Sequence, residues 1–422
     1  MKKFSMFISM FLVIAYLIFT VGFANATEPI VLAWPTTLDF PEGYQGRDAA
    51  IMATEEINSQ GGVNVGGEKR LLKIEAINTR GALPGVPVND ALMAYKQIIT
   101  SKQPTFIVGG AYRSEVLLAA MDYVSEKKLI HISSYAMTPV YNSKILENYD
   151  KYKYFFRVQA TAIDFAKLYP QVLESLSSQH GLKSAHLVVE DANWSVATGK
   201  FVEKWLNENN WEVTGFDKFP IGATDYSSAL NKIKKNKADV LVYAFSTPQS
   251  AMLMKQWHTM KVPCLPVGYL GATVGQKAWE AYDGKLEYVV SIPMAIGHIP
   301  IKAWPKSVEF YDSYKKRWGY GIEGGNCVST SYDAVYVVAD AINRANSLDT
   351  EKLIKTLEET DITGAIGRIR FGKDHNVIFG VDPQIAAIGC AFQWIAPGKM
   401  VPVFPASISE MNIVLPPWFK EK

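Results

Sequence analysis

Residues 185–245 decide the fold, and they read AHLVVEDANWSVATGKFVEKWLNENNWEVTGFDKFPIGATDYSSALNKIKKNKADVLVYAF. An apolar, strand-like run comes first, a helix-like segment follows it, and this order then repeats. The strand-like runs are 185–189, 212–219 and 239–245, and the helix-like segments are 198–209 and 226–236. Near-continuous apolar strands that alternate with helices are typical of a parallel sheet covered by helices on both faces. The stretch therefore predicts a doubly wound α/β unit.

The same alternation occupies the N-terminal part of the chain. Its strand-like runs are 30–34, 71–77, 105–108 and 129–133, and its helix-like segments are 47–58, 89–100 and 115–126. Two rounds of the pattern predict two doubly wound parallel-sheet lobes. Beyond residue 288 a strand, two helices and several short antiparallel strands follow. We infer that the chain returns to the first lobe and then adds edge strands to the second, which makes three crossings between the lobes.

These crossings define the expected domain boundaries. Lobe 1 comprises residues 27–156 and 291–364, lobe 2 comprises residues 157–290 and 365–405, and residues 406–422 form a C-terminal tail. A chain of about 400 residues is longer than one hydrophobic core usually serves, which agrees with two lobes.

The N-terminus has the pattern of a secretory signal peptide. Lys2 and Lys3 precede an apolar run at 4–23, which ends at Ala24-Asn25-Ala26. A basic start, an apolar core and a small-x-small site predict cleavage after Ala26, so that residues 1–26 are removed and the protein reaches the periplasm. An uncleaved membrane anchor is the alternative for an apolar stretch of this length.

Charge and cysteine content exclude several classes of partner. The sequence has 43 Lys and Arg and 41 Asp and Glu, and the predicted cleavage removes two Lys and no acid. The remaining chain has a formal charge of zero and offers no broad field to nucleic acid. Cys264, Cys327 and Cys390 lie far apart without a C-x-x-C motif, which argues against a metal or thioredoxin site and allows at most one disulfide.

Motifs of catalysis are missing from the sequence. It contains no G-x-x-x-x-G-K-[ST] run, no H-E-x-x-H and no G-x-S-x-G. The six His show no metal-ligand spacing. We therefore expect no catalytic residues, no cofactor and no metal, and a protein that binds a small molecule rather than an enzyme.

Candidate binding residues follow the ends of the predicted strands. In open α/β sheets, ligands bind at the carboxyl ends of the strands, where helix N-termini offer N–H groups. The first lobe places loops there at 109–114 and 133–139, and the second does so at 190–194, 245–249 and 268–271. A single Ser or Tyr in such a loop can equally cap a helix or pack. Five such loops from two lobes predict a ligand cleft between them.

The chain resembles the leucine/isoleucine/valine-type periplasmic binding proteins of ABC transporters, which have the type I fold. The resemblance covers essentially the whole mature chain and rests on modest motifs in the right order. They are Glu55-Glu56-Ile57-Asn58-Ser59-Gln60-Gly61-Gly62, Ile107-Val108-Gly109-Gly110, Ile132-Ser133-Ser134-Tyr135-Ala136, residues 154–157, Ala223-Thr224-Asp225-Tyr226 and Ala391-Phe392-Gln393-Trp394. The resemblance implies a two-lobed protein, expected to be a monomer, that closes on a small solute and docks on the membrane permease of an ABC transporter.

The resemblance also implies a set of ligand-binding residues. Ser114 matches the Ser that holds a ligand carboxylate, and the backbone at Tyr135 and Ala136 matches the carbonyl that meets an ammonium. The remaining positions depart from the family: Met137 stands for a Thr, although the neighbouring Thr138 could take its place. Trp194 and Ser246 stand for Tyr residues. The acid that pairs with the ammonium falls near Gly268-Tyr269, where no Asp or Glu occurs.

This last departure predicts the ligand class. A buried ammonium without a carboxylate costs several kcal/mol, on the order of the desolvation of an unpaired charge. We therefore expect an apolar or aromatic carboxylate, or a neutral amide-like solute, in preference to a standard α-amino acid. Trp194 and Tyr269 would supply flat contact area. Two other functions stay open: a ligand-sensing subunit for a membrane receptor and an exported enzyme on the same scaffold.

Overall fold

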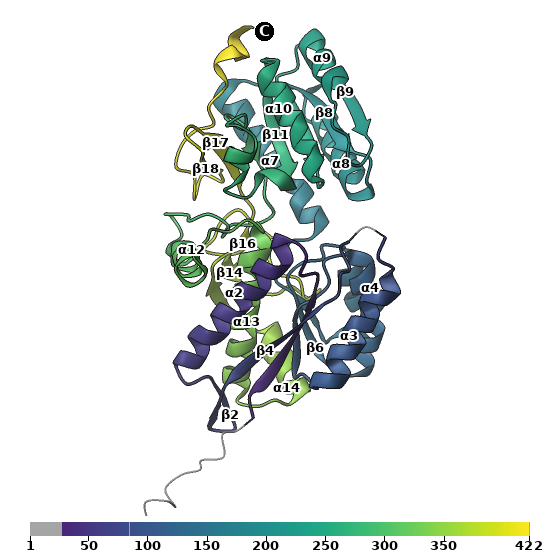
Figure 1. The fold of residues 1–422 in the computed structure, drawn as a ribbon, viewed down its shortest axis with the longest axis vertical. Coiled ribbons are helices and arrows are strands. Elements are labelled where there is room, and N and C mark those ends of the chain that lie inside the picture. The colour runs from purple at the N-terminus through teal and green to yellow at the C-terminus, as the bar shows by residue number, and fades with distance from the viewer. Residues whose placement is uncertain (1–27, 84, 422) are drawn as a thin grey trace, which may run out of the picture.

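The structure, a computed structural model, describes residues 28–83 and 85–421. It consists of two α/β lobes that lie end to end, with the C-terminus on the upper lobe (Figure 1). Each lobe is built on a largely parallel sheet, and this confirms the predicted fold class. The predicted signal peptide, residues 1–26, lies outside the described residues. Within the described ranges, no helix is long and apolar enough to span a membrane.

The sheet of the first lobe has five parallel strands in the order β4-β1-β5-β6-β7. Their bounds are β1 Ile30–Thr36, β4 Leu72–Asn78, β5 Phe106–Gly109, β6 Ile130–Ser133 and β7 Phe155–Arg157. Helices α2 (Pro41–Ser59) and α13 (Asn326–Ala345) pack against each other on one side of the sheet. Helices α3 (Val88–Lys102) and α4 (Ser114–Glu126) cover the other side (Figure 1). The central strands β5 and β6 are buried along their whole length, as strands covered on both faces are.

Smaller elements surround this lobe. They are the hairpin β2 (Val63–Val65) and β3 (Glu68–Arg70) and the helices α5 (Val140–Glu147), α6 (Tyr149–Tyr152) and α14 (Thr350–Glu358). Helix α12 (Pro305–Trp318) and a four-stranded sheet lie toward the junction of the lobes (Figure 1). The strands of that sheet are β13 (Ile362–Gly364), β14 (Gly367–Ile369), β16 (Ala387–Ile388) and β15 (Phe379–Gly380).

The second lobe has a seven-stranded sheet in the order β18-β17-β12-β11-β10-β8-β9. Its parallel strands are β8 (Ser184–Glu190), β9 (Glu212–Phe219), β10 (Val240–Phe245), β11 (Leu265–Leu270) and β12 (Val290–Ser291). The C-terminal strands β17 (Ala391–Ile395) and β18 (Lys399–Phe404) add antiparallel to one edge. The domain boundaries themselves stay a prediction.

Two apolar cores flank this second sheet. One contains side chains of α7 (Ala162–His180) and α8 (Asn193–Glu208). The other contains side chains of α9 (Ser227–Asn236) and α10 (Met252–Thr259), together with Trp418 of the C-terminal turn η3 (Pro417–Glu421). The short elements η1 (Pro248–Ala251), η2 (Gly271–Thr273) and α11 (Ala278–Ala281) complete the lobe.

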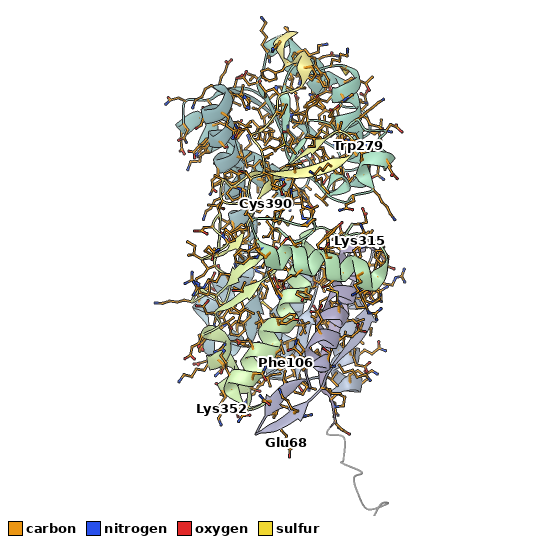
Figure 2. All side chains as sticks on the ribbon, turned by 90° about the vertical axis from the view of Figure 1, so that its left-hand side faces the viewer. Glu68, Phe106, Trp279, Lys315, Lys352 and Cys390 are labelled. Carbon is orange, nitrogen blue, oxygen red and sulfur yellow. The ribbon has the colours of Figure 1, made fainter. Side chains whose placement is uncertain are left out.

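Side chains fill the interior of both lobes (Figure 2). Phe106 is fully buried in the first lobe, and Cys390 is buried near the junction with the second (Figure 2). Cys264, Cys327 and Cys390 are all buried free thiols in the described part of the chain.

Strand order places a crevice in each lobe. In both sheets the chain moves from its first strand to an outer neighbour on one side and then to a third strand on the other side. The loops after the first and third strands therefore diverge, and a ligand crevice lies between their carboxyl ends. In lobe 1 this point lies between β1 and β5, and in lobe 2 it lies between β8 and β10.

Helix α2 begins at Pro41, earlier than the sequence predicts, and its first turn is packed unusually closely. A Cβ atom on Gly43 would lie 1.5 Å from the carbonyl oxygen of Thr37, and one on Gly46 would lie 2.1 Å from the hydroxyl of Tyr135. Because glycine lowers helix propensity, the sequence pattern does not reveal that this turn is helical. Glycine is needed at both positions because neighbouring atoms leave no space for a Cβ atom.

Candidate ligand-binding cleft

Three aromatic rings form the wall that lobe 1 contributes. The ring of Tyr135, which follows β6, has its centroid 6.2 Å from that of Trp34 in β1 and 6.2 Å from that of Tyr112 after β5. Its hydroxyl donates a hydrogen bond of 3.2 Å to the carbonyl of Glu42, which fixes the start of α2 against the wall. Tyr112 is 39% exposed, yet burial raises its pKa well above the ordinary value. Its ring therefore lines a recess that water can still enter.

Lobe 2 contributes a second aromatic wall. Trp194, the second residue of α8, has its ring centroid 6.0 Å from that of Tyr269 in β11, and the rings meet edge to face. Phe165 of α7 supports Tyr269 from the other side at 5.6 Å. Edge-to-face packing fixes both rings while it leaves their outer surfaces available for contact.

The loop of lobe 1 that carries Tyr135 and Met137 reaches the second wall. Burial is the main cause that raises the pKa of Tyr112, and the nearby hydroxyl of Tyr269 adds to it across the lobe boundary. Burial likewise raises the pKa of Tyr269, with further contributions from Glu42 and Cys327 of lobe 1. Met137, from the loop after β6, packs against the apolar core of lobe 2. Trp194 and Tyr269 pack against that same core, so the loop after β6 lies beside the second wall.

Ser114 lies at the start of α4, as its predicted role requires. It is the first helical residue, and the N-cap position belongs to Arg113, whose side chain makes no capping hydrogen bond. Ser114 is partly exposed, so its hydroxyl and the free N–H groups of the first turn can meet an anion.

The loop that carries Tyr135, Ala136 and Met137 is held from behind by Arg157. The buried guanidinium donates hydrogen bonds of 3.1 Å to the carbonyl of Ala136 and 2.9 Å to that of Thr138. Ala136 is itself buried and contributes backbone rather than side chain.

Ser246 has its hydroxyl engaged within lobe 2. It donates 2.6 Å to the carboxylate of Glu190, which also accepts the backbone N–H of Ser246 and the hydroxyl of Thr247. The contacts tie the ends of β8 and β10 together. Glu190 is thus buried and hydrogen-bonded, and Asp191 pairs with Lys218 on the surface.

Gly268 and Tyr269 lie inside β11, rather than in a loop beyond the strand as the sequence predicts. A Cβ atom on Gly268 would lie 1.9 Å from the carbonyl oxygen of Tyr243, so no acidic side chain fits at this position. Tyr269, the next residue in the strand, packs its ring edge to face against Trp194.

Sequence reasoning did not single out Glu42, which lies shortly after the first strand of lobe 1. It occupies the first turn of α2, which the sequence assigned to a loop. Burial raises the pKa of its carboxyl group, and its charge contributes to the raised pKa of Tyr112 and Tyr269. The available signal was its place just after the first strand of lobe 1, at the crevice.

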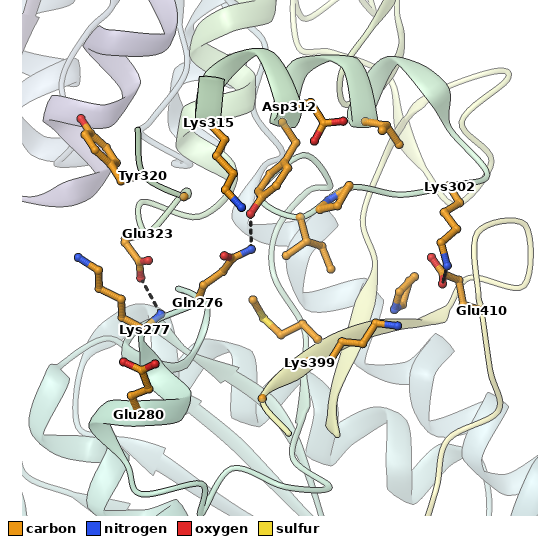
Figure 3. Close-up of a pocket in the computed structure, with 18 of the residues that line it drawn as sticks. Gln276, Lys277, Glu280, Lys302, Asp312, Lys315, Tyr320, Glu323, Lys399 and Glu410 are labelled. Carbon is orange, nitrogen blue, oxygen red and sulfur yellow. Dashed lines mark hydrogen bonds and ion pairs between the residues drawn. The ribbon is translucent and has the colours of Figure 1, made fainter. Parts of the chain in front are cut away.

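A second cavity, of about 860 Å³, spans the outer side of the lobe junction (Figure 3). It lies between α12 and the end of β18, and the backbone N–H of Lys277 donates 3.3 Å to Glu323 across it. Charged groups of both signs line it, among them Lys315, Asp312 and Lys399 (Figure 3). None of the residues predicted to bind the ligand lies in this groove. The aromatic cleft lies at the carboxyl ends of the parallel strands, where ligands bind in open α/β sheets, and is therefore the better candidate site. Across residues 28–83 and 85–421, no cluster of His, Cys, Asp or Glu is suited to a metal ion.

Comparison with known proteins agrees with this architecture. The family model described as periplasmic binding protein matches residues 40–381. The chain is similar to Leu/Ile/Val-binding protein homolog 7 of Brucella melitensis, with 24% identity over 392 residues that cover 90% of this chain and 91% of the relative.

Two solved structures share the fold. The branched-chain amino acid transporter substrate-binding protein of Streptococcus pneumoniae, in complex with isoleucine, is 18% identical with a TM-score of 0.69 and covers 92% of this chain and 100% of its own. An ABC transporter solute-binding protein of R. palustris, in complex with benzoate, is 14% identical with a TM-score of 0.66 and covers 91% and 98%.

Proposed function

Because this chain belongs to the periplasmic binding protein family, we propose that it is the substrate-binding component of an ABC transporter. It captures one small organic solute between its lobes, closes on it and delivers it to a membrane permease. Residues 1–26 direct export to the periplasm, where the mature protein works as a monomer. Capture is reversible and leaves the solute chemically unchanged.

The observation that carries this proposal is the pair of aromatic walls, one from each lobe. Tyr112 and Tyr135 come from lobe 1, whereas Trp194 and Tyr269 come from lobe 2. Aromatic side chains give a large contact area with few rotatable bonds, so they bind a flat or apolar body at low entropic cost. A ligand that touches both walls stabilises the closed form relative to the open one.

The polar end of the ligand is a carboxylate or an amide-like group. Ser114 and the N–H groups of the first turn of α4 support this choice, and the helix dipole favours negative charge there. Gly268 has no room for the acid that would pair with an ammonium. Benzoate, named for one structural neighbour, carries a carboxylate on an aromatic body, whereas isoleucine, named for the other, also carries an α-ammonium. We place an apolar or aromatic carboxylate ahead of its α-amino counterpart.

Calorimetric titration with phenylacetate and with phenylglycine, its α-amino counterpart, tests the ligand class. We expect phenylacetate to bind about tenfold to a hundredfold more tightly, as loss of ammonium hydration without a charge pair costs roughly 1–3 kcal/mol. Small-angle scattering should show compaction with phenylacetate, which should be recovered unchanged. Tighter binding of phenylglycine would contradict the ligand class, and multiple-turnover product would contradict the transport role.

Trp194→Ala tests the aromatic wall. We expect this change to weaken phenylacetate about tenfold or more, because the ring supplies contact area and also holds Tyr269 edge to face. Trp205→Ala is the matched control, since Trp205 lies on the same helix and packs against Trp211 instead. Calorimetry should show near-normal affinity for the control, and equal losses in the two variants would place the ligand elsewhere.

A further inference from the structure

Two loops, one from each lobe, meet beside the cleft. Residues 271–277 of lobe 2 directly follow β11, the strand that carries Tyr269 of the second aromatic wall. Residues 319–325 of lobe 1 connect α12 to α13. Both loops line the groove between α12 and the end of β18 (Figure 3). Contacts between them therefore join the lobes without involving any residue predicted to bind the ligand.

The loop of lobe 1 is fixed to the first aromatic wall. The side-chain oxygen of Gln45, a buried residue of α2, accepts the backbone N–H groups of Glu323 and Gly324, both at 2.7 Å. The next residue of the helix, Gly46, lies so close to the hydroxyl of Tyr135 that a Cβ atom would not fit. The loop therefore moves together with the wall of lobe 1.

Two hydrogen bonds and one close contact join the lobes at this place. The side-chain amide of Gln276 donates to the hydroxyl of Tyr311 in α12, and the backbone N–H of Lys277 donates 3.3 Å to the carboxylate of Glu323 (Figure 3). A Cβ atom on Gly275 would lie 2.1 Å from that carboxylate, so the glycine lets it approach the loop of lobe 2. We call these three contacts the latch.

Resting on the proposed function, we propose that the latch is formed in the closed protein and broken in the open one, so that it controls how fast a captured solute is released. Each half of the latch continues one aromatic wall of the cleft. A ligand that draws the walls together therefore also brings the two halves together, and the latch in turn favours the closed form. Its residues act as positioning residues, since none of them has to touch the ligand.

Two substitutions remove the same hydrogen bond from opposite sides, Gln276→Ala in lobe 2 and Tyr311→Phe in lobe 1. We expect each to raise the release rate of phenylacetate about threefold to tenfold, as loss of one hydrogen bond does. The association rate should change little, because the open form lacks the contact. The double variant should release phenylacetate no faster than either single variant, since both changes break one contact. Stopped-flow measurement gives both rates.

Tyr320→Phe is the matched control. Tyr320 lines the same groove, but its hydroxyl donates 3.0 Å to Asp48, which belongs to the same lobe. This variant loses a tyrosine hydroxyl without losing a contact between the lobes. Its release and association rates should match those of the unmodified protein.

Hydrogen exchange of the Lys277 amide, followed by NMR, reports on the latch without a ligand. The N–H group is protected when it donates to Glu323. Because the resting protein samples the closed form, the amide should exchange more slowly than in Glu323→Ala, even with no ligand present. Phenylacetate should slow the exchange further in the unmodified protein, and it should have a smaller effect in Glu323→Ala.

The outcomes separate the latch from the transport role. Release rates of Gln276→Ala and Tyr311→Phe that equal the rate of the control overturn the latch and leave the transport role standing. Slower association with unchanged release also overturns it, since the contact would then belong to the open form. Failure of phenylacetate to bind contradicts the ligand class alone. In that case, equal exchange of the Lys277 amide in the unliganded protein and in Glu323→Ala overturns the latch, and slower exchange in the unliganded protein supports it.

Discussion

Arg157 shows how one buried side chain positions a binding loop. Its guanidinium is fully buried and donates to the carbonyls of Ala136 and Thr138 and to the amide oxygens of Asn142 and Asn376. Burial lowers its pKa to about 10, so it stays charged at neutral pH. These bonds join the cleft loop to α5 and to the segment that precedes β15.

We expect Arg157→Met to lower the free energy of unfolding by about 3 kcal/mol, because it leaves buried carbonyl groups without donors. The loop of Tyr135 should also lose its fixed position, so ligand affinity should fall together with stability. Arg317→Met is the control, because its exposed pair with Glu55 contributes little to stability. Urea unfolding and calorimetry measure both effects, and equal stability losses in the two variants would contradict this role.

At the same scale, the sequence predicted some cleft residues better than others. Trp194 and Tyr269 form a wall because each is close to the end of an apolar strand, which a pattern can reveal. The hydroxyl of Ser246 is taken up by Glu190, a long-range contact that no local pattern contains. The helical first turn of α2 was missed for the same reason, since only tertiary contact with Tyr135 gives a glycine-containing turn a helical form.

Among the elements, β6 contains a histidine that is buried between a helix and a strand. The ring of His131 stacks on Tyr95 of α3 and lies 5.5 Å from the ring of Phe155 in β7. Burial lowers the pKa of His131 to about 3, so the folded protein holds it neutral. His298 is buried in the same way, and burial lowers its pKa to about 4.

Acid should therefore loosen the packing of β6. The unfolded chain protonates His131 below about pH 6.5 and the folded chain does not, so the free energy of unfolding falls as the pH drops from about 6.5 toward 3. Between pH 7 and pH 5 this residue accounts for about 2 kcal/mol. His131→Leu should lose less stability over this interval, as measured by urea unfolding at both pH values. Parallel stability curves for the two proteins would show that His131 is not the group responsible.

Element boundaries were predictable where burial decides them. The central strands of both sheets are buried on two faces, so their apolar runs mark them to within a few residues. β11 is an exception at its end: Gly268 reads as a turn residue, yet it is there because the carbonyl of Tyr243 leaves no space for a side chain. Contact with a neighbouring strand, not loop chemistry, explains that glycine.

At the level of the whole molecule, two lobes and a cleft followed from the repeated alternation and the strand order. The contacts between the two lobes could not be predicted from the sequence pattern. Glu323 of lobe 1 accepts the backbone N–H of Lys277 of lobe 2, and Met137 crosses to the opposite core. These contacts join residues far apart in the chain, and nothing in the local sequence marks either partner.

The packing of α13 against α2 also sets the order in which the molecule can be completed. As the chain emerges from the ribosome, every strand of the first sheet appears before α13, which ends at Ala345. Until then α2 alone covers one side of that sheet, and closing so long a loop is slow. A chain stopped after residue 300 should therefore expose α2 to protease, whereas a chain stopped after residue 360 should protect it. Lobe 1 is therefore the first lobe to be started and is completed late. Until α13 is made, the nascent protein exposes an apolar face that a chaperone can bind.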